Sequence, residues 1–212
     1  MTRKTKSQAE RPYHHGNLPE VLAAAAEALV REKGAHGFTL RECARRAGVA
    51  HSAPGHHFGS VARLLTEVAA RGFDRLTQRM QDERKGVSGP EALRRIGRAY
   101  VGFALSDPVI FVLMFHSDRV DRSVSRLQAA GEAAYGELVD AIALATGRRA
   151  RDEDALRFAW ATVHGIAMLL IDGRVKPGGV RHRGGDIAPA EGTIDRLVYA
   201  VTSYSANGRA KT

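Results

Sequence analysis

The sequence predicts an all-α protein. A small N-terminal domain of three helices is joined by a long fourth helix to a larger C-terminal helical bundle, with about nine helices in all. Apolar residues recur at helical spacing in one segment after another, and no segment alternates apolar and polar residues with the period of a strand. The composition agrees with this, because Ala, Leu and Arg are abundant and aromatic residues make up only 6% of the chain.

The chain of 212 residues is long enough for two compact units. Residues 1–15 are polar and basic without periodicity, so we expect a flexible basic arm. We expect residues 16–76 to form the N-terminal domain, residues 77–205 the C-terminal domain and residues 206–212 a tail.

The first helix is predicted to begin after Asn17. Asn17 can cap the helix, Pro19 is tolerated in a first turn, and Glu20 stands where a capping carboxylate reaches back. Gly34 is expected to end it.

The next two helices are predicted to be short. Thr39 followed three residues later by Glu42 forms a capping-box pattern, and Gly48 ends this second helix. A third helix is expected over residues 50–57. Ser60 then opens the long fourth helix, whose apolar residues recur on one face.

The rest of the chain predicts five more helices, with a Pro at the start of the first two. We expect these helices over residues 90–106, 108–115, 123–146, 152–171 and 193–204, and an exposed loop over residues 173–192, which are rich in Gly, Pro and basic residues.

Composition limits the class of protein. No segment has the ~18 to 20 uninterrupted apolar residues of a membrane span, and the basic N-terminus has no apolar stretch of a secretory signal. A single cysteine, Cys43, excludes an internal disulfide and fits the cytoplasm. The net charge of +9 favours a polyanionic partner, although arginine-rich proteomes also contain many basic proteins without one.

The span from Phe38 to His57 has the outline of a helix-turn-helix. Two short helices flank a Gly-containing turn, and small residues open the second helix, which would let it approach base edges in the major groove of double-stranded DNA. The alternative is an ordinary helical hairpin. The predicted DNA-binding residues are Thr39, Arg41, Ala50, His51, Ser52, Ala53, His56, His57 and Ser60.

The segments Phe38–Val49 and His57–Ser60 resemble the N-terminal domain of the TetR family of bacterial transcriptional regulators. The pattern Trp160-Ala161-Thr162-Val163-His164-Gly165 is similar to the Trp-His-Gly element of one branch of that family. The resemblance implies a homodimer formed by the last two long helices, a palindromic operator and a small-molecule effector.

The chain departs from the family pattern at two positions. Gly55 stands where the family commonly has Tyr, and Val61 stands where it usually has Lys; both family side chains lie against DNA phosphates. Their loss would remove roughly two phosphate contacts, which Arg45, Arg46 and Arg63 are candidates to replace.

Several aromatic and soft side chains are expected to meet in the C-terminal domain. They either fill its core or line a cavity for an apolar or aromatic effector. The predicted ligand-binding residues are Tyr100, Phe103, Phe111, Met114, Trp160, His164 and Met168.

The sequence therefore predicts a ligand-responsive regulator, a repressor that an effector releases from its operator. One alternative is a small-molecule-binding protein with a weakened DNA-binding domain. An enzyme is the other, but the sequence offers no catalytic constellation. We expect no cofactor. We also expect no metal, because no Cys or carboxylate joins the histidines near His57 to complete a tetrahedral ligand set.

Overall fold

The computed structural model describes residues 18–147, 152–175 and 187–207. These residues form nine α-helices and no strand, as predicted. The helices are α1 (Leu18–Lys33), α2 (Leu40–Ala47), α3 (Ala53–Phe58), α4 (Val61–Arg84), α5 (Pro90–Ser106), α6 (Pro108–His116), α7 (Ser125–Thr146), α8 (Glu153–Ile171) and α9 (Ala188–Asn207).

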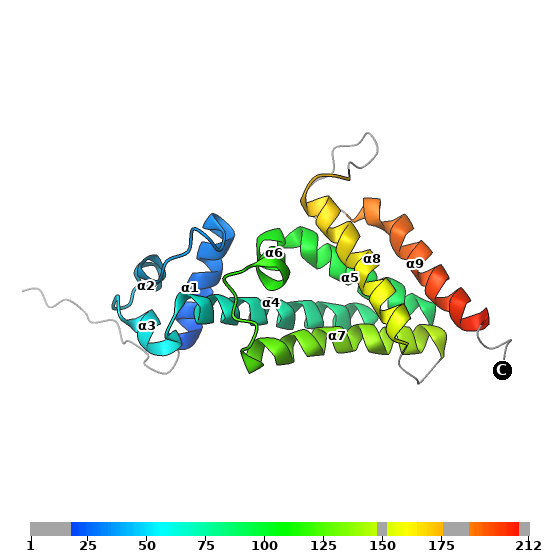
Figure 1. Cartoon of the computed structure of the whole chain (residues 1–212), viewed down its shortest axis with the longest axis horizontal. Helices are drawn as coiled ribbons and strands as arrows, with labels where there is room; N and C mark the ends of the chain where they lie inside the picture. The colour runs from blue at the N-terminus through cyan, green and yellow to red at the C-terminus, as the bar shows by residue number, and fades with distance from the viewer. Residues whose placement is uncertain (1–17, 148–151, 176–186, 208–212) are drawn as a thin grey trace, which may run out of the picture.

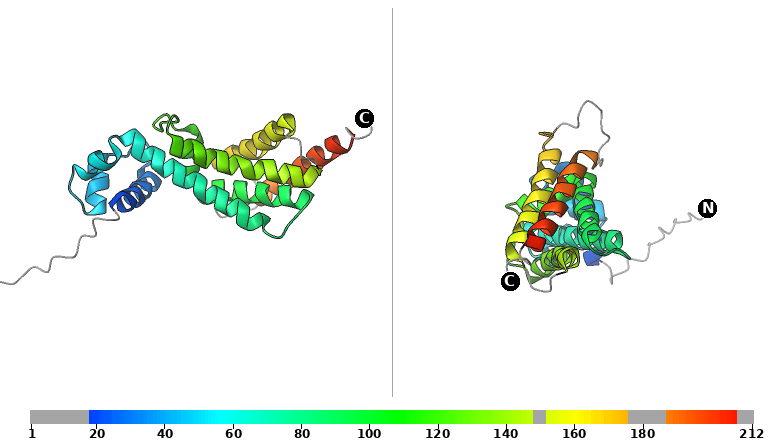
Figure 2. Two further views of the ribbon diagram at one scale, coloured as in Figure 1. Left: turned by 90° about the horizontal axis from the view of Figure 1, so that it is seen from below. Right: turned by 90° about the vertical axis from the view of Figure 1, so that its right-hand side faces the viewer.

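The molecule is elongated, with α1, α2 and α3 forming a small head at one end (Figure 1). Helix α4 runs from the head into the larger bundle, and α7 lies along it (Figure 2). Helices α8 and α9 pair with each other and cover α5. One apolar core continues from Leu22 in α1 through Leu65 and Leu76 in α4 to Val201 in α9, so the two domains share their packing.

Helix α6 lies across the bundle because the chain bends by 105° between α5 and α6. Asp107 ends α5, and Pro108 occupies the first turn of α6, where its missing N–H leaves no hydrogen bond unmade. This bend places α6 against both α4 and α1.

Several predicted boundaries differ from the structure by one to five residues. Helix α3 begins at Ala53 rather than at residue 50, because residues 50–52 form the turn. The expected loop is wrong over residues 188–192, which form the start of α9: Ala190 is fully buried, and Pro189 is compatible with a first turn. The predicted arm, Asn17, residues 148–151 and 176–186 and most of the tail lie outside the described residues.

Within the described ranges, α8 is long enough and apolar enough to cross a membrane. Helices α5 and α6 reach that length and hydropathy only when they are taken together as a bent pair. Only 22% of the apolar window of α8 is buried in this single chain. Helix α8 therefore keeps apolar surface available to a partner.

Candidate functional site

Local capping sets the geometry of the helix-turn-helix. The Thr39 hydroxyl accepts a hydrogen bond from the Glu42 N–H at 3.3 Å and caps α2. Gly48 adopts φ 67°, which Gly reaches without strain, and its N–H bonds back to the last turn of α2. The Glu42 carboxylate binds Lys33 at 2.6 Å, and this hydrogen bond lowers the pKa of Glu42.

The recognition helix α3 is only six residues long. Pro54 is buried in its first turn, and Ser52 makes no side-chain cap. The following helix begins sharply, because the Ser60 hydroxyl accepts from the Arg63 N–H at 3.2 Å. Both capping residues, Thr39 and Ser60, were identified from the sequence.

Eight of the nine predicted DNA-binding residues are exposed, and Ala53 is half-buried. Thr39, Arg41 and His51 line one shallow hollow between α2 and the turn, together with Arg45. His57 lies elsewhere, beside a second hollow that Arg63 also lines. The head thus presents polar and basic groups on the face formed by α2, the turn and α3.

The charges of this face are not equally available to phosphates. Arg45 pairs with Glu42 at 3.5 Å, and Arg46 pairs with Glu32. Across the residues that the structure covers, neither Arg41 nor Arg63 lies within 4.0 Å of a carboxylate oxygen, although the charge of Arg63 helps to lower the pKa of Asp121. Arg41 and Arg63 are therefore the better candidates for phosphate contacts.

Gly55 faces open space: a Cβ built there would meet no atom within 4 Å. A larger side chain is sterically possible at this position of α3. Cys43 is buried, and burial raises the pKa of its thiol to about 11, which makes it a core residue rather than a nucleophile. In the described part of the chain no three His, Cys, Asp or Glu side chains converge as metal ligands.

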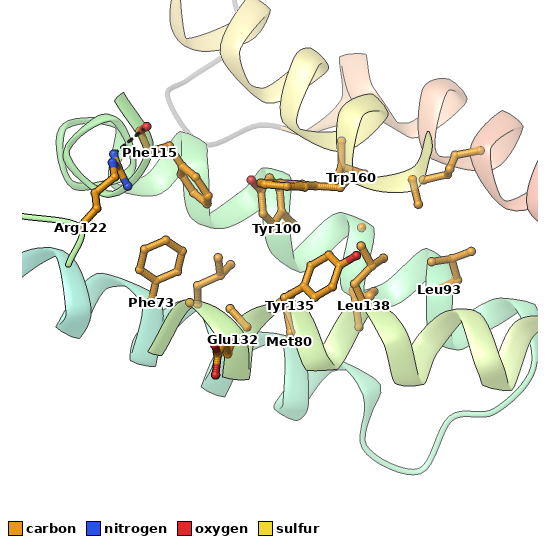
Figure 3. Close-up of a pocket in the computed structure, with 18 residues that line it drawn as sticks. Phe73, Met80, Leu93, Tyr100, Phe115, Arg122, Glu132, Tyr135, Leu138 and Trp160 are labelled. Carbon is orange, nitrogen blue, oxygen red and sulfur yellow. Dashed lines mark hydrogen bonds between the residues drawn. The ribbon is translucent and has the colours of Figure 1, made fainter. Parts of the chain in front are cut away.

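The C-terminal domain contains a cavity of about 450 Å³, within the ~300–1,000 Å³ range of small-molecule sites. Figure 3 shows its aromatic wall, to which α4 contributes Phe73, α5 Tyr100, α6 Phe115, α7 Tyr135 and α8 Trp160. The remaining lining residues are Leu76, Met80, Leu93, Ile96, Gly97, Arg122, Gly131, Glu132, Ala134, Leu138, Ala159, Val163 and Leu197.

A row of hydrogen-bonded side chains outside the cavity contacts this wall. The Tyr100 hydroxyl lies 2.8 Å from His164 Nδ1, and His164 Nε2 lies 3.1 Å from His116 Nε2. Burial raises the pKa of Tyr100. The pKa of His164 is lowered, first by burial and second by His116. The hydrogen bond with His164 orients the Tyr100 ring on the cavity wall.

Of the seven predicted ligand-binding residues, the structure places Tyr100 and Trp160 on the cavity wall. His164 holds Tyr100 from outside the cavity. Phe111 and Met114 are fully buried, and neither they nor Phe103 and Met168 line the cavity. Phe111 packs behind the wall, with its ring centroid 5.5 Å from that of Tyr100 and 4.9 Å from that of Phe115. Wall residues that the sequence did not indicate include Phe73, Arg122 and Tyr135.

Helix α6 connects the cavity to the head at both of its ends. Before its first turn, Asp107 accepts hydrogen bonds from Arg31 of α1, the shortest at 2.7 Å. Just beyond its last turn, Arg119 donates to the Ala35 carbonyl, and the Asp121 N–H donates to Thr66 Oγ1 at 2.9 Å.

Helix α6 also lies very close to α4. A Cβ at Gly72 would lie 2.6 Å from the Met114 sulfur, so only Gly permits this approach. Helices α6 and α4 are therefore in direct contact at Gly72.

Helices α8 and α9 carry large apolar side chains that stay exposed in the single chain. On α8, Phe158 is 49% and Leu169 42% exposed, and on α9 Tyr199 is 73% exposed. Phe158, Gly165 and Leu169 recur at helical spacing on one face of α8, and nothing lies within 4 Å of a Cβ at Gly165.

Two family models match the chain. The tetR family of bacterial regulatory proteins matches residues 22–68, and the tetracyclin repressor-like C-terminal domain matches residues 93–204. A protein of unknown function from Rhodococcus sp. RHA1 has a similar structure, with 31% identity and a TM-score of 0.70 over 94% of this chain and 98% of that one.

Two further proteins are more distant. The uncharacterized HTH-type transcriptional regulator YobS of Bacillus subtilis (strain 168) is 24% identical over 50% of this chain and 57% of its own length. AibR in complex with isovaleryl coenzyme A and operator DNA shares the fold at 18% identity, with a TM-score of 0.59 over 87% of this chain and 98% of that one. The chain belongs to the TetR family of bacterial transcriptional regulators.

Proposed function

We propose that this protein is a cytoplasmic, homodimeric repressor that an apolar or aromatic effector releases from a palindromic DNA operator. The observation that carries the proposal is the coexistence of an exposed helix-turn-helix and a separate apolar cavity in one continuous core. The complex of AibR with both operator DNA and isovaleryl coenzyme A supports the same pairing of partners here.

The DNA half of the proposal rests on the head. Thr39, Arg41 and His51 surround one hollow on its surface, and phosphates would be met by Arg41 and Arg63. A dimer would present two such heads to two half-sites about one DNA turn apart. The exposed apolar face of α8 and α9 is the surface on which we place the dimer contact, because a monomer would leave it in water.

The effector half rests on the position of α6. Phe115 lies on the cavity wall, while Asp107 at the other end of α6 is bonded to Arg31 of the head. A ligand that displaces Phe115 would shift α6 and change the separation of the two heads. Ligand and DNA then favour different states of the dimer, which is the requirement for release.

The test is selection of bound DNA from random sequence by the purified protein, followed by affinity measurements across a range of salt. We expect a palindromic site, with affinity falling steeply as salt rises. A protein that selects no sequence, or whose binding ignores salt, would instead be the small-molecule-binding protein with a weakened DNA-binding domain.

A further inference from the structure

The cavity has one charged group that stands out chemically. Only Arg122 and Glu132 among its lining residues carry a charge. Glu132 is exposed on α7, and its side chain points away from Tyr100 and Phe115 (Figure 3). Arg122 is also exposed, but its side chain lies beside Phe115 at one end of the cavity, and its hydrogen bond to the Met114 carbonyl is part-buried (Figure 3). The cationic end of the cavity is thus opposite an apolar end at Leu93 and Leu138.

Arg122 has no carboxylate partner in the described part of the chain, although other arginines of the same bundle do. Arg84 pairs with Glu137 at 2.7 Å, and Arg126, four residues from Arg122, pairs with Asp74. Arg122 instead donates to two backbone carbonyls of the last turn of α6, from Nη1 to Met114 at 3.1 Å and from Nη2 to Phe115 at 2.9 Å.

These two hydrogen bonds tie the Arg122 side chain to the C-terminal end of α6. A guanidinium has five N–H donors in a planar fork, so further donors remain for an anion. A carboxylate accepts two of them in parallel and binds more strongly than a neutral carbonyl does. A carboxylate in the cavity would therefore bind the remaining donors and pull the guanidinium away from the α6 carbonyls.

We propose that the effector is a hydrophobic monocarboxylate. Its carboxylate binds Arg122, and its hydrocarbon or aryl body lies along the wall between Phe73 and Leu138. Binding weakens the hydrogen bonds from Arg122 to the Met114 and Phe115 carbonyls, so that α6 can move. This inference rests on the proposed function, because it assigns the chemistry of the effector to the same cavity.

The test compares decanoate with decan-1-ol, which has the same chain and no charge. Both are titrated into the full-length protein while the fluorescence of Trp160, the single tryptophan, is followed. We expect decanoate to bind roughly 10- to 100-fold more tightly than decan-1-ol. Equal affinities would overturn the proposal.

Variants assign the preference to Arg122. Arg122→Gln should abolish the preference for decanoate while decan-1-ol still binds, and Arg122→Lys should keep part of it. The control Glu132→Gln removes the other charge of the cavity and should leave the preference unchanged. If Arg122→Gln unfolds, Arg122→Lys tests the proposal instead. A purely structural Arg122 would leave the ratio of decanoate affinity to decan-1-ol affinity at the value of the parent protein.

The inference and the proposed function can fail separately. The ligand-free protein is first tested for sequence-selective DNA binding, and decanoate is then added to the complex. Absence of selective binding would contradict the proposed function. The protein could instead bind DNA selectively while decanoate neither weakens that binding nor changes the Trp160 fluorescence. That result would overturn only the carboxylate proposal and would leave the proposed function standing.

Discussion

The head and the C-terminal bundle place their functional residues in different ways. In the head they come from one segment, from Thr39 to Ser60, and nearly all of them are exposed. In the bundle the aromatic wall of the cavity combines side chains from five helices, from Phe73 of α4 to Trp160 of α8. The function of the head is thus local in sequence, whereas that of the bundle arises only when the helices meet.

The dimer face should give the largest effect, because both regions depend on it. Leu169→Glu puts a charge into the exposed apolar face of α8. We expect a monomer in sedimentation and a loss of operator affinity of more than about 100-fold, since two linked heads gain avidity that one head lacks. Leu144→Glu, which changes a similarly exposed residue of α7 outside the α8 and α9 face, should remain dimeric; monomers from both variants would contradict the assigned face.

Filling the cavity should weaken effector binding in the bundle without affecting DNA binding by the head. Gly131 lines the cavity, and a Cβ built there meets no atom within 4 Å, so Gly131→Phe directs a ring into free space. Effector affinity should fall by more than about tenfold while DNA binding persists. Gly136→Phe on the same helix is the matched control, because Gly136 has equal space but does not line the cavity. Equal loss in both variants would mean that the ligand binds elsewhere.

The converse variant lies in the head. Arg41→Ala removes an exposed cation without an ion pair among the described residues. Operator affinity should fall about tenfold, and the slope of log affinity against log salt should decrease by about one unit. Effector binding, followed by Trp160 fluorescence, should not change. An unchanged salt slope would place Arg41 away from the phosphates.

The smallest effect is expected from the two departures from the family pattern. Gly55→Tyr uses open space in α3 and replaces a helix-weakening Gly, and Val61→Lys adds a cation at the start of α4. Each should strengthen operator binding a few-fold, and Val61→Lys should steepen the salt slope by about one unit. If neither variant binds better, the arginines already present occupy those phosphates.

The same contrast explains what could be predicted from the sequence. Thr39, Gly48, Ser60 and Pro90 mark helix ends through local chemistry, and the structure confirms each of them. Which residues of α6 line the cavity could not be predicted, because this helix is apolar on every side from Val109 to Phe115. The sequence pointed to the buried side chains of Phe111 and Met114, while their neighbour Phe115 lines the cavity.

Arg122 shows the same limit more sharply. It follows α6 in an irregular segment that has no periodicity, so nothing in the sequence indicates that it reaches the cavity. Its role depends on the bend at Asp107, which turns α6 so that its last carbonyls meet the guanidinium. Residues brought together by such bends are visible only in the folded chain.

The central claim is that cavity and head are two sites of one coupled molecule. It is tested most directly by measuring the coupling in both directions on the same sample. Operator affinity is determined with and without decanoate, or another ligand that quenches Trp160, and ligand affinity is determined with and without operator. Linkage requires the two factors to be equal, and we expect both in the usual range of about 5- to 150-fold. A ligand that fills the cavity and leaves operator affinity unchanged would contradict the account.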